Sequence, residues 1–323
     1  MMKNAKKIAL GLGCVLLALG LCLCAVSWLL GAPRQDWSTL DTRDITTESY
    51  DVTGSFTALR VESQECDVRL LPADDGKCRV LCTAEEGAET DVRVSNGTLL
   101  IQHSAPARNA LFSLNTAPTE ISVYLPAEEY RALSISSASG DITVEAPFRF
   151  TGDVELKALS GDILFTAAAE NALTLSSTSG DIEVSGADCT SLSLHATSGD
   201  IEASALRVAE ILSVSMTSGS IKLTDCTAAA LNVRNTSGSI RLTDVLCDEG
   251  DIHNVSGSIT LLRCDGERLL LESTSGSISG TLRTEKVFSA KSTSGSVHVP
   301  DTASSGVCEA RTTSGSIRLD VEQ

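Results

Sequence analysis

Apolar and polar residues alternate in short runs that recur about every 19 residues over the last 185 residues of the chain. Each repeat is centred on a Ser-Gly pair, which is followed by Asp or Ser and then by Ile or Val. Counted from that glycine, positions minus seven, minus five, plus two and plus four are mostly aliphatic, and the positions between them are mostly polar. This alternation predicts two short strands in each repeat, each with one buried face. The ten central glycines are Gly140, Gly161, Gly180, Gly199, Gly219, Gly238, Gly257, Gly276, Gly295 and Gly315.

A fixed period of this length is typical of a solenoid, in which every repeat is one coil stacked on the last. We therefore predict an all-β chain with a parallel β-solenoid (β-helix) of about ten 19-residue coils over residues 131–323. A crossover of about eight residues would close each coil, and Ile182, Ile201 and Ile221 would form one interior column. The competing fold is an antiparallel sandwich, which needs no near-identical period.

The Ser-Gly pair is the expected corner between the two strands of a coil. Glycine can adopt the positive φ that a sharp turn needs, and the serine hydroxyl can satisfy turn backbone groups. The corner residues that we single out are Ser139, Gly140, Ser179, Gly180, Ser198, Gly199, Ser218 and Gly219.

The residues before the repeats divide into four segments. Residues 51–130 alternate without a fixed period, and the Asn96 and Gly97 pair signals a hairpin, so we predict an antiparallel β region that caps the solenoid. Residues 31–50 are polar and without periodicity, and we expect them to form a stalk. Residues 8–30 are an uncharged apolar run, long enough for a transmembrane signal-anchor helix. Three lysines within residues 1–7 place that segment in the cytoplasm and the C-terminal domain outside the cell, as in a single-pass protein of the cell membrane.

Two other interpretations of the apolar run stay open. A cleaved secretory signal normally has a shorter apolar core and a small-residue cleavage site. A lipoprotein site would need a small residue before Cys22 or Cys24, where the chain has leucines.

The chain is acidic, with a formal net charge of −17. This charge argues against nucleic acid as a partner, because phosphate contacts need Lys and Arg. The acidity either keeps a surface protein soluble or attracts cations and cationic peptides.

Candidate chemistry is sparse, and we expect no cofactor and no catalytic site. Asp follows the corner glycine in the first four repeats, and a ladder of these carboxylates could bind calcium, or each could cap its own turn. His103 and His298 have no evident partners and are expected at the surface. After Tyr130 the chain has no Tyr or Trp to stack on a sugar, which disfavours a carbohydrate-active enzyme. The ladder residues are Asp141, Asp162, Asp181 and Asp200.

Eight cysteines follow the apolar run, and their spacing matches no zinc pattern. Most are expected to be small buried core residues. A bridge from Cys247 to a neighbouring coil stays open.

Three motifs together resemble the bacterial putative-adhesin family of β-strand-repeat proteins of unknown function. These are Phe56-x-x-Leu59-x-Val61, then Val123-Tyr124-Leu125-Pro126, and then the Ser-Gly-Asp-Ile series. The resemblance implies an envelope protein with a β-solenoid ectodomain, whose relatives are linked to adhesion or envelope stress. It supplies no catalytic residues.

These observations favour a membrane-anchored, extracellular, non-catalytic interaction or adhesin-like module whose partner is a component of the cell envelope. One alternative is an envelope-stress sensor or decoy that binds cationic peptides, and another is a carbohydrate-active β-helix enzyme. Because the chain ends soon after the last repeat, we also expect weak self-association through an uncovered C-terminal coil.

Overall fold

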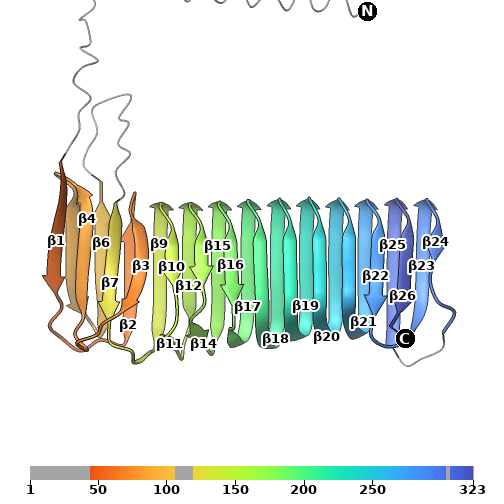
Figure 1. Cartoon of the computed structure of the whole chain (residues 1–323), viewed down its shortest axis with the longest axis horizontal. Coiled ribbons are helices and arrows are strands. Elements are labelled where there is room, and N and C mark those ends of the chain that lie inside the picture. The colour runs from red at the N-terminus through yellow and green to blue at the C-terminus, as the bar shows by residue number, and fades with distance from the viewer. Residues whose placement is uncertain (1–43, 106–118, 303–305, 323) are drawn as a thin grey trace, which may run out of the picture. The chain divides into compact units, whose positions relative to one another are not determined.

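The structure is a computed structural model that describes residues 44–105, 119–302 and 306–322 (Figure 1). These residues form strands joined by turns, and the repeats form a parallel β-solenoid. No helix within the described ranges has the length and apolarity that a bilayer crossing requires. The predicted signal-anchor at 8–30 and the cytoplasmic segment 1–7 lie outside these ranges.

The early turns of the solenoid consist of separate short strands on each side of a Ser-Gly corner. The strands before the corners are β9 (Ala132–Ser139), β12 (Val154–Ser160), β15 (Ala172–Ser179) and β17 (Asp188–Ser198). Those after the corners are β10 (Ile142–Val144), β13 (Ile163–Phe165) and β16 (Ile182–Ser185). A small parallel sheet closes the first turns through β8 (Glu129–Tyr130), β11 (Arg149–Phe150) and β14 (Ala168–Ala169).

The interior contains the aliphatic column that the repeat predicts. Ile182 is in register with Ile201, which in turn is in register with Ile221. All three side chains are at most 1% exposed. Each turn therefore buries its apolar positions directly against those of its neighbours, and the stack is one continuous core.

The crossovers of the middle turns differ from the expected two strands and a loop. Here one strand runs from each corner to the next, because the crossovers also pair with their neighbours. A single residue with a φ of 52–54° kinks each strand, and the next residue is buried. The long strands are β18 (Ile201–Ser218), β19 (Ile221–Ser237), β20 (Ile240–Ser256) and β21 (Ile259–Ser275), and their kink residues are Ala205, Asp225, Asp244 and Arg263.

The N-terminal part, residues 45–125, combines parallel turns with antiparallel caps. Strands β2 and β3 pair in parallel with β9 and β10, so parallel stacking begins at Ala58, well before the expected boundary at residue 131. Strands β6 and β7 form a further layer outside β2 and β3. Antiparallel pairing of β5 with β6, of β4 with β7 and of β1 with β4 covers that end. These strands are β1 (Ile45–Asp51), β2 (Ala58–Ser63), β3 (Asp67–Pro72), β4 (Arg79–Glu85), β5 (Glu89–Ser95), β6 (Thr98–Ser104) and β7 (Glu120–Leu125).

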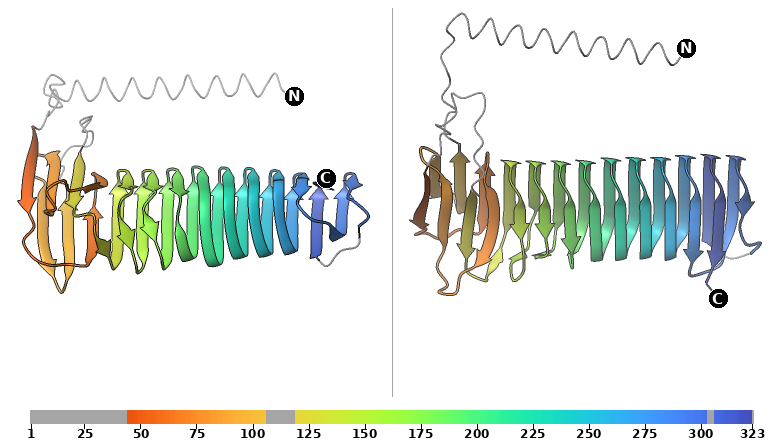
Figure 2. Two further views of the ribbon diagram at one scale, coloured as in Figure 1. Left: turned by 60° about the horizontal axis from the view of Figure 1, so that its bottom comes forward. Right: turned by 45° about the horizontal axis from the view of Figure 1, so that its top comes forward.

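At the other end, the last two turns are stacked in the reverse of their sequence order (Figure 2). Strands β25 and β26 insert between β21 and β22 on one side and β23 and β24 on the other. The expectation that the C-terminal coil is the uncovered end is therefore wrong, since the uncovered turn is that of β23 and β24. The strands are β22 (Ile278–Leu282), β23 (Lys286–Ser294), β24 (Val297–His298), β25 (Gly306–Ser314) and β26 (Ile317–Val321).

Candidate interaction surfaces

The Ser-Gly corners hold neighbouring turns at backbone contact. The amide of Gly161 donates to the carbonyl of Ser179 at 2.9 Å, and the same bond recurs along the stack. A Cβ on Gly161 or Gly219 would lie well under 3.0 Å from the carbonyl oxygen of the preceding corner glycine, and both residues have positive φ. The corner therefore requires glycine for two reasons, the φ value and the close approach of the next turn.

The aspartates that follow these glycines bond to backbone on the next turn. The Asp162 carboxylate accepts from the amide of Asp181 at 2.7 Å, and the Asp181 carboxylate accepts from the amide of Asp200 at 2.7 Å. Asp141 and Asp200 make the equivalent bonds to Asp162 and Ser220. The described residues contain no group of three or more His, Cys, Asp or Glu side chains that could hold a metal ion. This geometry supports turn capping and gives the calcium hypothesis no ligand set.

The strand surface before the corners carries a flat patch of hydroxyl groups, which we call the hydroxyl face. Its residues are in register from turn to turn, so Thr174 lies beside Ser193, and Ser193 lies beside Ser213. In the second row, His195 Nδ1 and Ser215 Oγ are 2.8 Å apart. The Glu155 and Lys157 ion pair, at 2.5 Å, is the charged element within the patch. The hydroxyl face comprises Ser134, Ser136, Thr174, Ser176, Ser193, Ser213 and Ser215.

The strand surface after the same corners is acidic, and we call it the carboxylate face. Glu183 and Glu202 are in register on neighbouring turns, next to the row of corner aspartates. The next turn ends the acidic stretch, because Lys222 Nζ pairs with Glu202 at 2.5 Å. The carboxylate face comprises Asp141, Asp162, Asp181, Asp200, Glu183 and Glu202.

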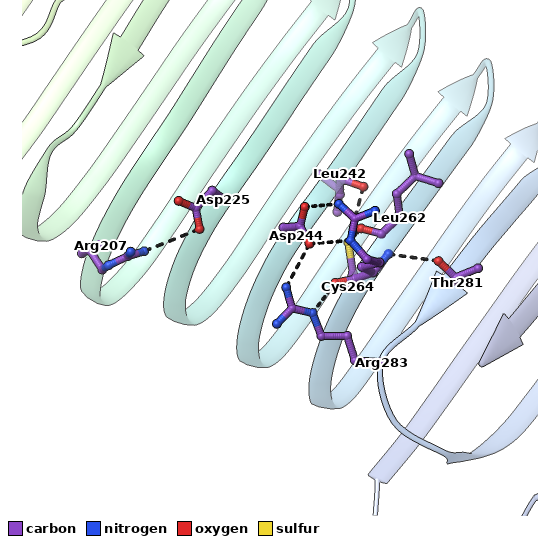
Figure 3. Close-up of polar contacts among 9 residues, drawn as sticks. Arg207, Asp225, Leu242, Asp244, Leu262, Cys264, Thr281 and Arg283 are labelled. Atoms are coloured by element: carbon purple, nitrogen blue, oxygen red, sulfur yellow. Dashed lines mark hydrogen bonds and ion pairs between the residues drawn. The ribbon is translucent and has the colours of Figure 1, made fainter. Parts of the chain in front are cut away.

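The kinks of the middle turns carry ion pairs between neighbouring turns (Figure 3). Asp244 accepts from Arg263 Nε at 2.8 Å and from Arg283 at 2.9 Å. The hydrogen bond from Arg263 holds the pKa of the Asp244 carboxyl below its ordinary value. Arg283 also donates to the carbonyl of Arg263 at 2.9 Å. These contacts link three turns at the exposed edge.

A buried polar cluster lies between β4, β5 and β6. Cys82 Sγ is 3.3 Å from Thr90 Oγ1 and 3.5 Å from His103 Nδ1, and Thr90 Oγ1 is 3.0 Å from the same ring nitrogen. The neighbouring Cys66 thiol is the largest cause of the lowered pKa of the Cys82 thiol, and the His103 and Thr90 contacts lower that pKa further. His103 is 5% exposed, so the expectation of a surface histidine is wrong for this residue. The cluster could not be recognised from the sequence, because the three residues come from different strands and match no motif spacing.

The other cysteines follow the prediction of small buried core residues. All eight described cysteines are free thiols, and seven of them are buried. Cys247, the half-buried exception, donates to the carbonyl of Asp265 at 3.7 Å and forms no bridge. Burial raises the pKa of the thiols of Cys189 and Cys226 to about 11.

Three of the four aromatic residues of the repeats lie in the core, and the fourth, Phe288, is half-buried on the uncovered turn of β23. Phe148, Phe150 and Phe165 are at most 1% exposed. Tyr130 is buried against Phe56, with ring centroids 6.2 Å apart, and donates to the carbonyl of Pro126 at 2.9 Å.

Comparison with known sequences gives one family match. The profile of the family described as Toastrack DUF4097 matches residues 56–241 and residues 207–323. No curated protein matches the chain.

Comparison with solved structures finds similar chains of bacterial origin. They include a putative adhesin from Bacteroides fragilis, with 15% identity over 86% of this chain and 98% of that chain and a TM-score of 0.43. A putative lipid binding protein from Parabacteroides distasonis has 16% identity over 86% and 97%, with a TM-score of 0.44. A putative cell adhesion protein from Clostridium sporogenes has 11% identity over 86% and 100%, with a TM-score of 0.21. At these TM-scores the likeness does not bear on function.

Proposed function

Because the chain belongs to the Toastrack DUF4097 family, whose profile covers the solenoid and most of its cap, we propose that it is a non-catalytic, adhesin-like interaction module of the cell surface. In this proposal the N-terminal segment 8–30 anchors the module in the cell membrane, and the solenoid binds a component of the envelope outside the cell. The observation that carries the proposal is the hydroxyl face. Its hydroxyl groups lie in register on neighbouring turns, and the aliphatic columns beneath them are buried.

The hydroxyl face suits an extended partner with repeating polar groups. Its rows repeat at the strand spacing of about 4.8 Å along the stack, and the two rows are about 7 Å apart along each strand. Because the underlying aliphatic columns are fully buried, the hydroxyl groups need little reordering when a partner binds, and this lowers the entropic cost of association.

The charge of the N-terminal segments supports the membrane anchor. An uncharged apolar run of 23 residues is long enough to cross a bilayer, and the preceding lysines favour a cytoplasmic N-terminus. The acidic solenoid is then expected on the outer side.

The carboxylate face favours a second candidate function, the capture of cationic peptides. Six carboxylates lie on four successive turns, and Lys222 on the next turn pairs with one of them, Glu202. Such capture would depend strongly on salt, because exposed charges are screened above physiological ionic strength.

A binding experiment with matched surface variants separates the two candidates. The full chain, reconstituted in lipid discs, is immobilised and exposed to isolated envelope fractions at low and high salt. We expect Ser193→Arg with Ser215→Arg to lower retention of envelope material severalfold at both salt concentrations. Loss with Glu183→Lys and Glu202→Lys, only at low salt, would instead favour peptide capture.

A topology experiment tests the placement. A protease-sensitive tag after Gln323 should be cleaved by external protease in intact cells. Protection of that tag, or retention that neither pair of substitutions lowers, would overturn the proposal.

A further inference from the structure

The turn formed by β23 and β24 leaves its interior side chains open to solvent. Val297 is 42% exposed, although it is in register with Ile317, which is 0% exposed. Phe288 is half-buried, whereas its register partner Cys308 is buried. The core of the stack therefore ends in an apolar patch, which we call the end surface. It comprises Phe288, Ala290, Val297 and Val299.

The backbone at this end is a strand edge without a neighbour. Strand β23 pairs with β25, and β24 pairs with β26, and within the described residues no strand lies on their other side (Figure 2). At earlier corners the amide of one turn donates to the next turn, as the Gly315 amide does to the Ser294 carbonyl at 3.1 Å. The amide of Gly295 holds the same position on the last turn, where no further turn follows. An edge of this kind is a template for another strand.

The opposite end of the core is closed. Leu99 and Val123 lie on β6 and β7, the outermost parallel layer, and both side chains are buried. Beyond that layer, β5 and β4 continue the sheet in antiparallel pairing. A chain whose core is open at one end cannot stack head to tail without limit, so identical ends close on each other about a two-fold axis.

The open edge carries an acidic and a basic side chain on the same side of the sheet. Glu285 directly precedes β23, and Lys291 lies six residues further on, so both share the exposed set of alternating positions. Within the described chain, neither side chain has an ion-pair partner. Both charges therefore remain available to a second strand.

These charges are self-complementary in one antiparallel register. When Phe288 lies opposite Phe288 of a second copy, Lys291 of each copy lies opposite Glu285 of the other. The neighbouring registers that keep the apolar side chains toward the core differ by two residues, and they place Lys291 opposite Arg283 or Val287. The charge pattern therefore favours a second copy of this chain as the strand that covers the end surface.

We propose that two copies of the chain pair end to end, with β23 antiparallel to β23 of the second copy and with two symmetric ion pairs between Lys291 and Glu285. Burial of the end surface supplies the driving force, and the ion pairs set the register. The two stacks then share one continuous sheet. This pairing does not depend on what the hydroxyl face binds.

A charge exchange tests the register. Sedimentation of the full chain in detergent, at low salt and over a series of concentrations, should show a shift from monomer to dimer and no further. Lys291→Glu alone and Glu285→Lys alone each place like charges opposite each other twice, and each should weaken dimerisation about tenfold. An equimolar mixture of the two variants should recover dimerisation, because every facing pair then joins opposite charges.

A matched control makes the same change of charge elsewhere. Lys77→Glu alters an exposed lysine of the N-terminal cap and should dimerise like the unaltered chain. Circular dichroism confirms that each variant is folded. A photoreactive residue in place of the exposed Val287 should cross-link, in intact cells, to the peptide around Ser289 of a second copy.

The proposal fails if the unaltered chain stays monomeric or assembles beyond the dimer. It also fails if both single variants dimerise as the unaltered chain does, which would place the contact elsewhere, or if their mixture does not recover dimerisation. Cross-linking from position 287 to a different protein, with none to a second copy, would equally overturn it.

Discussion

The corner glycines offer a sharp test of how the turns are held together, and Gly219→Ala is the substitution to make. Gly219 has a φ of +131°, and an added Cβ would lie well under 3.0 Å from the carbonyl oxygen of Gly199 on the preceding turn. The substitution therefore adds two penalties, one from the backbone conformation and one from the contact between turns.

The magnitude follows from the bonds that join these two turns at the corner. Holding alanine at this φ costs about 1–3 kcal/mol. Relief of the contact requires the turns to separate, which weakens the bond from the Ile201 amide to the Ser220 carbonyl, at 3.0 Å, and that from the Ser220 amide to the Asp200 carboxylate, at 2.7 Å. At about 1 kcal/mol for each bond, the total loss is about 3–5 kcal/mol of the free energy of unfolding.

Gly76→Ala is the matched control. Gly76 also has positive φ, at +66°, but nothing lies within 4 Å of its added Cβ. The control should cost about 1–2 kcal/mol, and the effect of the glycine on the entropy of the unfolded chain is the same at both sites and cancels.

Urea unfolding of the full chain in detergent, followed by circular dichroism, measures both variants. Because stacked repeats can unfold in stages, the transition must first be shown to coincide for two probes. Equal losses for Gly219→Ala and Gly76→Ala would refute the close contact between turns.

Three further experiments, each built on a substitution, test other parts of the structure. Ile201 lies in the interior column and is 0% exposed, so Ile201→Ala should lower the free energy of unfolding by about 2–5 kcal/mol. Ile211 is 39% exposed, so Ile211→Ala should lower the same free energy much less. Urea titration of both variants measures the difference. The buried Lys286 ammonium lies 2.7 Å from the Asp265 carboxylate. Lys286→Met leaves that carboxylate without its cation and should destabilise the fold by about 3–5 kcal/mol. A chain with both Lys286→Met and Asp265→Leu should recover most of that loss, as measured by thermal unfolding. Asp244 has a lowered pKa in the folded protein, so its contribution is complete above the ordinary value of 3.8 and is lost as the pH falls through the folded value. Asp244→Asn should therefore reduce the acid-side drop in unfolding temperature, and an unchanged pH profile would contradict the pairing with Arg263.

The solenoid core could be predicted from the sequence because two periods act on the same residues. Alternation places Ile182, Ile201 and Ile221 on the buried face, and the 19-residue repeat places them over one another. The corner glycines could also be predicted, since positive φ recurs at nine of the ten corners, all except Gly276. The buried columns and the corners therefore both follow from residue type and spacing along the chain.

The order of the last two turns could not be predicted because their interfaces are nearly interchangeable. Both β23 and β25 carry an apolar residue, Phe288 or Cys308, at the same register position, and either could stack on Leu269. The crossover kinks were also missed, because Asp225 and Asp244 adopt a positive φ that the sequence does not mark as glycine would.

The thiol cluster depends on contacts between strands, and no motif in the sequence indicates these contacts. Cys82 lies on an antiparallel cap strand, and Cys66 lies at the corner of a parallel turn. The packing of β4 against β5 and β6 brings Cys82 to Thr90 and His103, so spacing along the chain could not reveal the cluster.

The most direct test of the stacking is a set of distances between spin labels attached through encoded keto amino acids, which avoids the native cysteines. One label replaces Ser176, and the second replaces Arg234, Glu272, Arg311 or Lys291, all at the same repeat position. The stacking predicts separations that grow by about 4.8 Å per turn, with the label at 291 farther away than the label at 311. Separations that do not increase along the series, or a label at 311 that is the most distant, would contradict the structure described above.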